Sequence, residues 1–217
     1  MRCASLLLVG TVFLASCASR PLVVATASPC ATPDLRSVGT VLLLEPQRRI
    51  VDLRGRETSQ AYQSASLTQE LLLTAAAESL LARQPAVPTV GPQAEQWPLE
   101  EAAQLRSWSD RSLQVTRGGR LDPGEIGALL DGLGLPGNTA VLFSSLDARL
   151  GDDGYDVVPL MWSGQAQTHM TVLRTALFFR DSAVPAWTNT LLLRASPAAD
   201  SPELRQAVRQ LFLPLQR

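Results

Sequence analysis

The residue with the clearest chemical role is Cys17, a thiol placed where a short apolar run near the N-terminus ends. Residues 1–17 read MRCASLLLVGTVFLASC, with one cation at Arg2 and an apolar run from Leu6 to Ala15. That run is much shorter than the roughly 20 residues that a helix needs to cross a bilayer. A basic start, a short apolar run and small residues at its end are typical of a cleaved secretory signal. Cys17 follows the small residues directly, so its thiol is available for alkylation.

The sequence Leu14-Ala15-Ser16-Cys17 resembles the lipobox of bacterial lipoproteins. In that family the cysteine takes a diacylglyceryl group, and the signal is cut immediately before it. The resemblance implies a signal peptide over 1–16 and a lipid anchor on Cys17, with fatty acids such as palmitate; multiple acyl chains give stable anchoring. Ala18, in place of Asp, implies the outer membrane and a domain that faces the periplasm. The alternative is an ordinary secretory signal with a cysteine there by chance.

Cys30 is the only cysteine left if Cys3 leaves with the signal and Cys17 carries lipid. A disulfide within the mature chain is then impossible, and an odd cysteine in an exported protein either pairs between chains or stays free. Cys30 lies in a Pro/Ala/Thr-rich stretch without a basic neighbour that would activate it. We favour an incidental thiol over an intermolecular bridge.

The other residues with catalytic or ligand chemistry form no recognised motif. His169 is the only histidine. A histidine base in a catalytic triad needs a nucleophile and an orienting acid nearby, and since neither is recognisable around His169, a structural or surface role is favoured. Asp152, Asp153 and Asp156 lack the spacing and the final Glu of a calcium-binding EF-hand, so a solvated turn is favoured. Nucleophile-elbow, Walker A and dinucleotide-binding patterns are missing. We therefore expect no catalytic residue, no metal site and no cofactor.

The densest charge feature is an arginine cluster between two predicted elements. It comprises Arg48, Arg49, Arg54 and Arg56, with Glu45, Asp52 and Glu57 interleaved. A solvated loop with local ion pairs is favoured over contact with anionic headgroups or an acidic partner. The formal net charge of −1 gives no reason to expect a nucleic-acid partner.

Periodicity indicates the elements that position these residues. Residues 17–37 are rich in Ala, Ser, Pro and Thr and predict a lipidated, flexible tether, and 38–217 predict a single periplasmic domain. We expect strands at 41–44, about 50–53, 139–146, 157–162, 168–180 and 187–193, with turns at 151–154 and 181–183. Helices are expected from a capping box at Ser66 to Leu81, over 99–113, from Asp122 to about 132, and from Ser201 to Pro214, with a proline-rich loop over 84–98. The four tryptophans are expected in the core or on the sheet.

This order predicts an α+β (or α/β) fold: a mixed sheet with a C-terminal antiparallel hairpin and helices packed on the sheet. Residues 41–46 read VLLLEP, a Leu/Ala-rich helix follows, and 173–193 read LRTALFFRDSAVPAWTNTLLL. Over about 38–195 this pattern resembles the TolB-N-terminal-like domain of envelope lipoproteins, such as the curli-secretion lipoprotein and the penicillin-binding-protein activators. The resemblance implies a protein-binding or assembly role without catalysis. The long amphipathic hairpins of the pore-forming members are not recognisable in this sequence.

Three functions remain to be separated. The first is a non-enzymatic envelope lipoprotein that binds another protein, which predicts a sealed core with an exposed strand edge or apolar patch. The second is an accessory lipoprotein of a lipid or ABC transport system, which predicts an apolar cleft. The third is an enzyme of unfamiliar type, which predicts two carboxylates buried close together. The sequence leaves the partner and the oligomeric state open.

Overall fold

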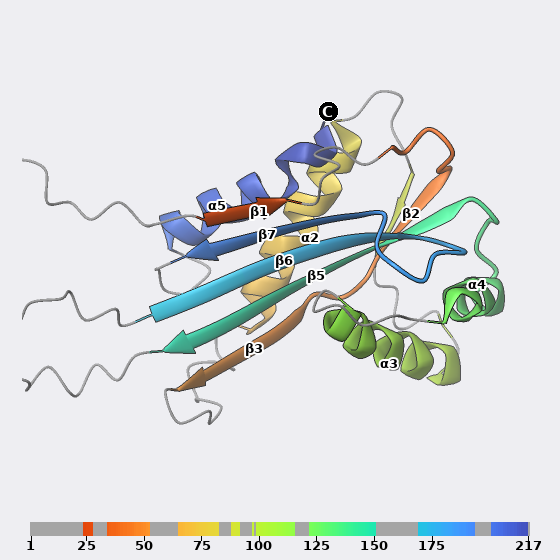
Figure 1. The fold of residues 1–217 in the computed structure, drawn as a ribbon, viewed down its shortest axis with the longest axis horizontal. Coiled ribbons are helices and arrows are strands. Elements are labelled where there is room, and N and C mark those ends of the chain that lie inside the picture. Colours follow the sequence, from red (N-terminus) through yellow and green to blue (C-terminus); the bar gives the residue numbers. More distant parts are fainter. Residues whose placement is uncertain are drawn as a thin grey trace, which may run out of the picture.

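The computed structural model confirms an α+β fold, in which helices pack on both faces of one mixed sheet (Figure 1). It describes residues 24–27, 34–52, 65–82, 88–91, 97, 99–115, 122–150, 169–193 and 201–216. The described strands are β1 (Val24–Ala27), β2 (Thr40–Leu43), β3 (Gln47–Asp52), β4 (Thr89–Val90), β5 (Thr139–Leu150), β6 (His169–Phe179) and β7 (Trp187–Leu193). The described helices are α2 (Ala65–Leu81), α3 (Leu99–Val115), α4 (Pro123–Gly132) and α5 (Pro202–Phe212), followed by the 3-10 helix η1 (Leu213–Gln216). None of them is both long and apolar enough to span a bilayer.

The sheet combines parallel and antiparallel strands, as predicted. Its order is β1-β7-β6-β5-β2-β4, and β3 also pairs with β5. β2 and β3 run parallel to β5, and β4 runs parallel to β2. The predicted C-terminal hairpin is confirmed, because β6 and β7 pair antiparallel from Thr171 with Leu193 to Leu177 with Trp187.

A bulge separates β2 from β3 along the same edge of β5. Leu43 pairs with Leu142, and Gln47 pairs with Ser145, so the bulged strand contains one residue more than β5 between these two pairs. Pro46 lies in the bulge, and it has no N–H to donate to the sheet. Bulges are among the few places in a sheet that accept proline, which explains why the strand resumes after it.

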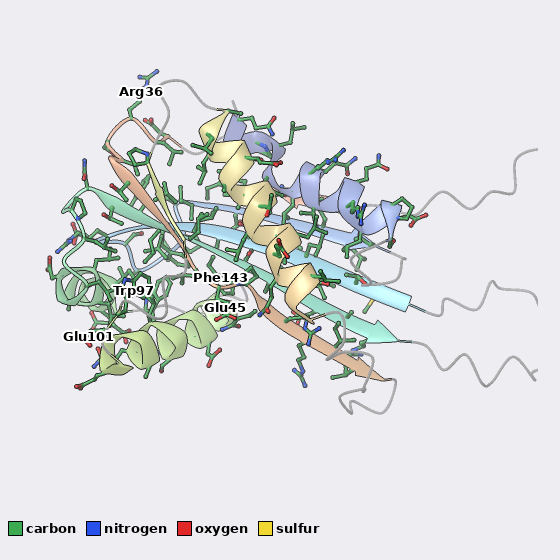
Figure 2. The ribbon with its side chains drawn as sticks, turned by 180° about the vertical axis from the view of Figure 1, so that it is seen from behind. Arg36, Glu45, Trp97, Glu101 and Phe143 are labelled. Atoms are coloured by element: carbon green, nitrogen blue, oxygen red, sulfur yellow. The ribbon has the colours of Figure 1, made fainter. Side chains whose placement is uncertain are left out.

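Two apolar cores lie on the two faces of the sheet. The first packs under α2 and α5, which Figure 2 shows in front of the sheet, and its members include Ile50, Leu72, Leu80, Leu142, Leu146, Leu173, Trp187, Leu191, Ala207, Val208, Leu211 and Phe212. The second packs under α3 and α4, and its members include Leu42, Leu44, Leu105, Trp108, Ile126, Leu130, Phe143, Ala176 and Phe178. Trp108 and Trp187 are fully buried, which confirms the core placement predicted for these two residues.

The predicted periodicities place residues in these cores as expected. Along β6, Leu173 and Leu177 enter the first core, whereas Ala176 and Phe178 enter the second, in agreement with the alternation of a strand. The apolar stripe of α5 is buried in full; it comprises Leu204, Ala207, Val208, Leu211 and Phe212. Because both faces of β6 are apolar near its C-terminal end, this part of the sheet lies between two helix layers.

The helix starts agree with the sequence in two cases and differ in a third. The carboxylate of Asp122 accepts a hydrogen bond from the N–H of Gly124 at 3.0 Å, and Ser201 accepts one from the N–H of Leu204 at 3.3 Å. α2 begins at Ala65, so Ser66 lies inside the first turn and not before it as predicted. Glu125, in the first turn of α4, pairs with Arg111 of α3.

Two segments predicted to lack regular structure contain strands, so both predictions were wrong in part. Val24–Ala27, inside the predicted tether, forms β1 on the edge of β7, and Leu35 is buried in the first core. Thr89–Val90, inside the predicted proline-rich loop, forms β4 on the edge of β2. Backbone hydrogen bonding to an existing strand is sufficient for such short edge strands, and it leaves little pattern in the sequence. The turn predicted at 151–154 and the strand predicted at 157–162, with Trp162, lie outside the described residues.

Candidate functional site

The bulge between β2 and β3 is fixed by side chains from helices on opposite faces of the sheet. The amide nitrogen Nε2 of Gln69, on α2, donates to the carbonyl oxygen of Pro46 at 3.0 Å and to the carboxylate of Glu45 at 3.4 Å. Gln47, at the start of β3, donates to the carboxylate of Asp110 on α3. Figure 2 labels Glu45 at this place. These contacts determine the position from which β3 continues along β5.

Beyond the bulge, β3 is an open edge of the sheet among the described residues. Its six residues, Gln47 to Asp52, pair with Ser145 to Leu150 of β5. β4 pairs only with Val41 and Leu42 of β2, so it does not extend along β3. Within the described part of the chain, therefore, no strand pairs with the outer side of β3. Gln47 and Arg48 have contacts of their own, and from Arg49 to Asp52 such an edge can accept another strand.

Beyond the contact of Gln47 with Asp110 on α3, the part of the sheet that contains β3 is covered by the described helices on one face only. We call it the distal half: β3, residues 145–150 of β5, residues 169–174 of β6, residues 190–193 of β7, and β1. On the face toward α2 and α5, Leu146, Leu173 and Leu193 are fully buried. On the opposite face, α3 and α4 lie over the other end of the sheet, and the strands extend past them (Figure 1).

We call this uncovered surface the bare face. Alternation along the strands places on it Arg49, Val51, Ser145, Asp147, Arg149, Met170, Val172, Arg174, Thr190 and Leu192. Arg49, Arg149 and Met170 are exposed, Val51 and Ser145 are buried, and the others are half-buried. The bare face therefore combines cations, one carboxylate, hydroxyl groups and aliphatic side chains.

One ion pair lies within the bare face. The guanidinium of Arg174 contacts the carboxylate of Asp147, and the two side chains are 21% and 29% exposed. Since this carboxylate is paired, the exposed guanidiniums of Arg49 and Arg149 give the described bare face a positive net charge. Neither arginine was identified together with Arg174 from the sequence, because the three lie on three different strands. Only the pairing of β3, β5 and β6 brings them to one face.

The predicted site residues are distributed as follows. Cys17 and Cys30 lie outside the described residues, as do Arg54, Arg56, Asp152, Asp153 and Asp156. His169 is the first residue of β6 and pairs in register with Leu150. Arg48 and Arg49 are neighbours on β3 and therefore belong to opposite faces of the sheet, so this part of the predicted arginine cluster is divided and lies on a strand, not on a loop.

The described residues contain no group of three or more His, Cys, Asp and Glu side chains suited to a metal ion. Among the described residues, the carboxylate of Glu203 has a lowered pKa. The hydroxyl of Ser201, which donates to Glu203 at 2.8 Å, and the backbone N–H of Glu203 hold the pKa of Glu203 below its ordinary value. Both residues belong to the first turn of α5, so the shift reflects helix capping and not a catalytic site.

No family model matches the chain, and no curated protein matches it. Among solved structures, the PelC dodecamer from Paraburkholderia phytofirmans aligns over 91% of this chain and 99% of that chain, with 14% identity and a TM-score of 0.38. A point variant of the same PelC dodecamer aligns over 91% of this chain and 98% of that chain, with 12% identity and a TM-score of 0.38. A TM-score of this size does not establish a shared fold.

Proposed function

We propose that this chain is a bacterial outer-membrane lipoprotein, anchored through an acylated Cys17, whose periplasmic domain binds a second envelope protein along β3. The observation that carries the binding role is the open outer side of β3 among the described residues. An extended segment of a partner can add to such an edge, with main-chain hydrogen bonds that supply affinity. The resemblance to TolB-N-terminal-like lipoproteins implies the same kind of role, and we propose no catalytic one.

The side chains of β3 indicate which partner segment fits. Arg49 is exposed on the bare face, one strand away from Asp147, with which it pairs in register. Charged residues and a bulge on an edge strand disfavour pairing with an arbitrary strand. We therefore expect a partner strand that places a carboxylate beside Arg49, because an unpaired or like charge there would oppose the pairing.

The anchor is tested separately from the partner. Replacing Cys17 by Ser removes the thiol that accepts the lipid. In the proposed lipoprotein, the Cys17→Ser protein leaves the membrane fraction or retains its signal peptide, and mass spectrometry of the wild-type protein finds a mature N-terminus at an acylated Cys17. Membrane retention of a fully processed Cys17→Ser protein would contradict the anchor.

The binding edge is tested with a photo-crosslinking amino acid at position 49, in cells that make the full chain. Position 78 is the control, because Glu78 is exposed on α2, away from β3. We expect a discrete crosslinked product from position 49 and not from 78. Once its partner is identified and purified, Arg49→Glu should weaken the complex several-fold, whereas Glu78→Arg should not. Equal crosslinking from both positions would argue against β3 as the binding edge.

A further inference from the structure

The start of β1 fixes where the chain enters the domain. Val24, the first residue of β1, pairs with Leu192 of β7, and Leu192 pairs with Val172 of β6. Val172 in turn pairs with Asp147 of β5. Val24 therefore lies in the distal half of the sheet, close to the strand ends at Leu150 and His169 in β5 and β6. In Figure 1, β1 begins at the end of the sheet opposite to α4.

The strand shortens the tether that the sequence predicted. Cys17 precedes Val24 by seven positions. Seven residues at full extension span at most about 25 Å. The distal half of the sheet is thus held within about 25 Å of the acyl anchor, whereas a tether of some 20 residues could extend almost three times as far.

This distance disfavours one orientation of the domain on the membrane. β5 has 12 residues, which correspond to about 40 Å at the rise of a strand. If the opposite end of the sheet, near Thr139, rested on the bilayer with the strands upright, Val24 would stand about 27 Å above it, a height that requires a tether held at full extension and is therefore entropically unfavourable. The remaining arrangements, with the domain upright on its distal end or lying on one side, keep the distal end near the lipid.

Two exposed side chains lie together at that end. Arg149 of β5 and Met170 of β6 are partners in register, one residue before the last pair of the β5–β6 ladder. Met170 is 42% exposed although it is apolar, and Arg149 is also exposed. A cation beside an exposed apolar side chain suits the boundary between headgroups and acyl chains, where the apolar group is buried and the guanidinium stays with phosphate.

We propose that the distal end of the sheet rests on an anionic phospholipid surface, with Met170 in the headgroup region and Arg149 beside lipid phosphates. This inference rests on the proposed acylation of Cys17. It gives the domain a fixed orientation in which α4 points away from the membrane. The strand β3 then runs away from the membrane surface, so that a partner beside the domain can reach its outer side.

The test uses the full mature, acylated protein in vesicles of phosphatidylcholine with a minority of phosphatidylglycerol. In a Cys30→Ser background, a fluorophore is attached to Met170→Cys or, as the matched control, to Ala128→Cys on the exposed side of α4. A quencher attached to lipid headgroups should quench the label at 170 several-fold more than the label at 128. Equal quenching at the two positions would overturn the proposal.

Two further variants test its parts. A flexible insertion of about 20 glycine and serine residues after Ala18 lengthens the tether to roughly that of an unstructured linker, so quenching at position 170 should fall. Arg149→Glu should lower quenching at 170 on vesicles with phosphatidylglycerol and have little effect on pure phosphatidylcholine. Unchanged quenching in both variants would overturn the proposal. Circular dichroism of each variant confirms that the fold is retained.

Failure of the underlying lipidation has a different signature. Without acylation, the protein does not float with either kind of vesicle, and its mass lacks the lipid. That result would refute the anchor on which the inference rests. A protein that carries the lipid and floats, but shows equal quenching at 170 and 128, would leave the anchor in place and refute only the orientation.

Discussion

Arg174 and Asp147 form an ion pair across β5 and β6 although they are not opposite each other. Ser145 is the partner of Arg174 in register, and Val172 is the partner of Asp147. The contact is therefore diagonal, which the length of the arginine side chain permits. It joins the two strands in the part of the sheet that no described helix covers on this face.

We predict that Asp147→Asn lowers the free energy of unfolding by about 1 kcal/mol, as expected for a half-buried cross-strand pair. Arg111→Gln is the control, since the Arg111–Glu125 pair is more exposed, with 47% of the Arg111 side chain accessible. Removing that pair should cost less than about 0.5 kcal/mol. Urea unfolding followed by circular dichroism measures both, and an equal loss in the two variants would contradict the prediction.

The second apolar core depends on one large side chain. Trp108 is fully buried, and its ring packs edge-on against Phe178 with 5.0 Å between the ring centroids. We expect Trp108→Ala to destabilise the domain by about 3–5 kcal/mol, through lost apolar burial and the cavity left behind. Leu81→Ala, at a position 58% exposed, should change stability by less than about 0.5 kcal/mol. A well-tolerated Trp108→Ala would show that this helix layer contributes little to stability.

Two glycines near the end of α4 should respond to alanine in opposite directions. Gly134 has a φ of 67° in the left-handed region, so Gly134→Ala should cost about 1 kcal/mol. Gly132 is helical, and a Cβ added there would lie 3.5 Å from Cγ of Glu101, an ordinary contact. Gly132→Ala should therefore be neutral or stabilising by up to about 1 kcal/mol. Thermal unfolding of both variants tests the contrast.

The first turn of α5 contains a pH-dependent contact. The Ser201 hydroxyl holds the pKa of Glu203 below its ordinary value, so the contact stabilises the fold above the unfolded-state pKa of Glu203. This contribution is lost as the pH falls through the lower, folded-state pKa. In Ser201→Ala the pKa of Glu203 should rise, whereas Ser201→Thr should keep it low. A carbon NMR titration of the Glu203 carboxyl group measures this; an unchanged pKa in Ser201→Ala would assign the shift to the backbone contact alone.

The sequence predicts the fold where burial imposes a period. The alternation of Leu173, Ala176, Leu177 and Phe178 identifies β6, and the apolar stripe of α5 identifies a helix against the sheet. The start of α4 is identified by Asp122, whose side chain accepts a backbone hydrogen bond, and by Pro123 at the first helical position. In each case the physical requirement falls on side chains and is therefore visible in the residue types.

The bare face and its boundaries were not predictable in the same way. β1 and β4 are held by backbone hydrogen bonds to a neighbouring strand. Such bonds place few requirements on the side chains of β1 and β4, so these strands leave little pattern in the sequence. The meeting of Arg49, Arg149 and Arg174 depends on strand order and register, and these are set by contacts between residues far apart in the chain. The alternation of residues along one strand shows which of its side chains share a face of the sheet. It does not show which other strand will be its neighbour.

The extra residue between β2 and β3 has a consequence for the chemistry of the surface. Odd-numbered residues of β2, such as Val41 and Leu43, face the first core, whereas in β3 it is the even-numbered Ile50 that does so. The bulge thus reverses the phase of the strand. Were the same residues to pair with β5 without a bulge, Arg49 would lie opposite Ala148 and turn beneath α2, and Ile50 would turn outward, because a shift of one residue exchanges the two faces. The bulge therefore decides on which side of the sheet the charge of Arg49 lies.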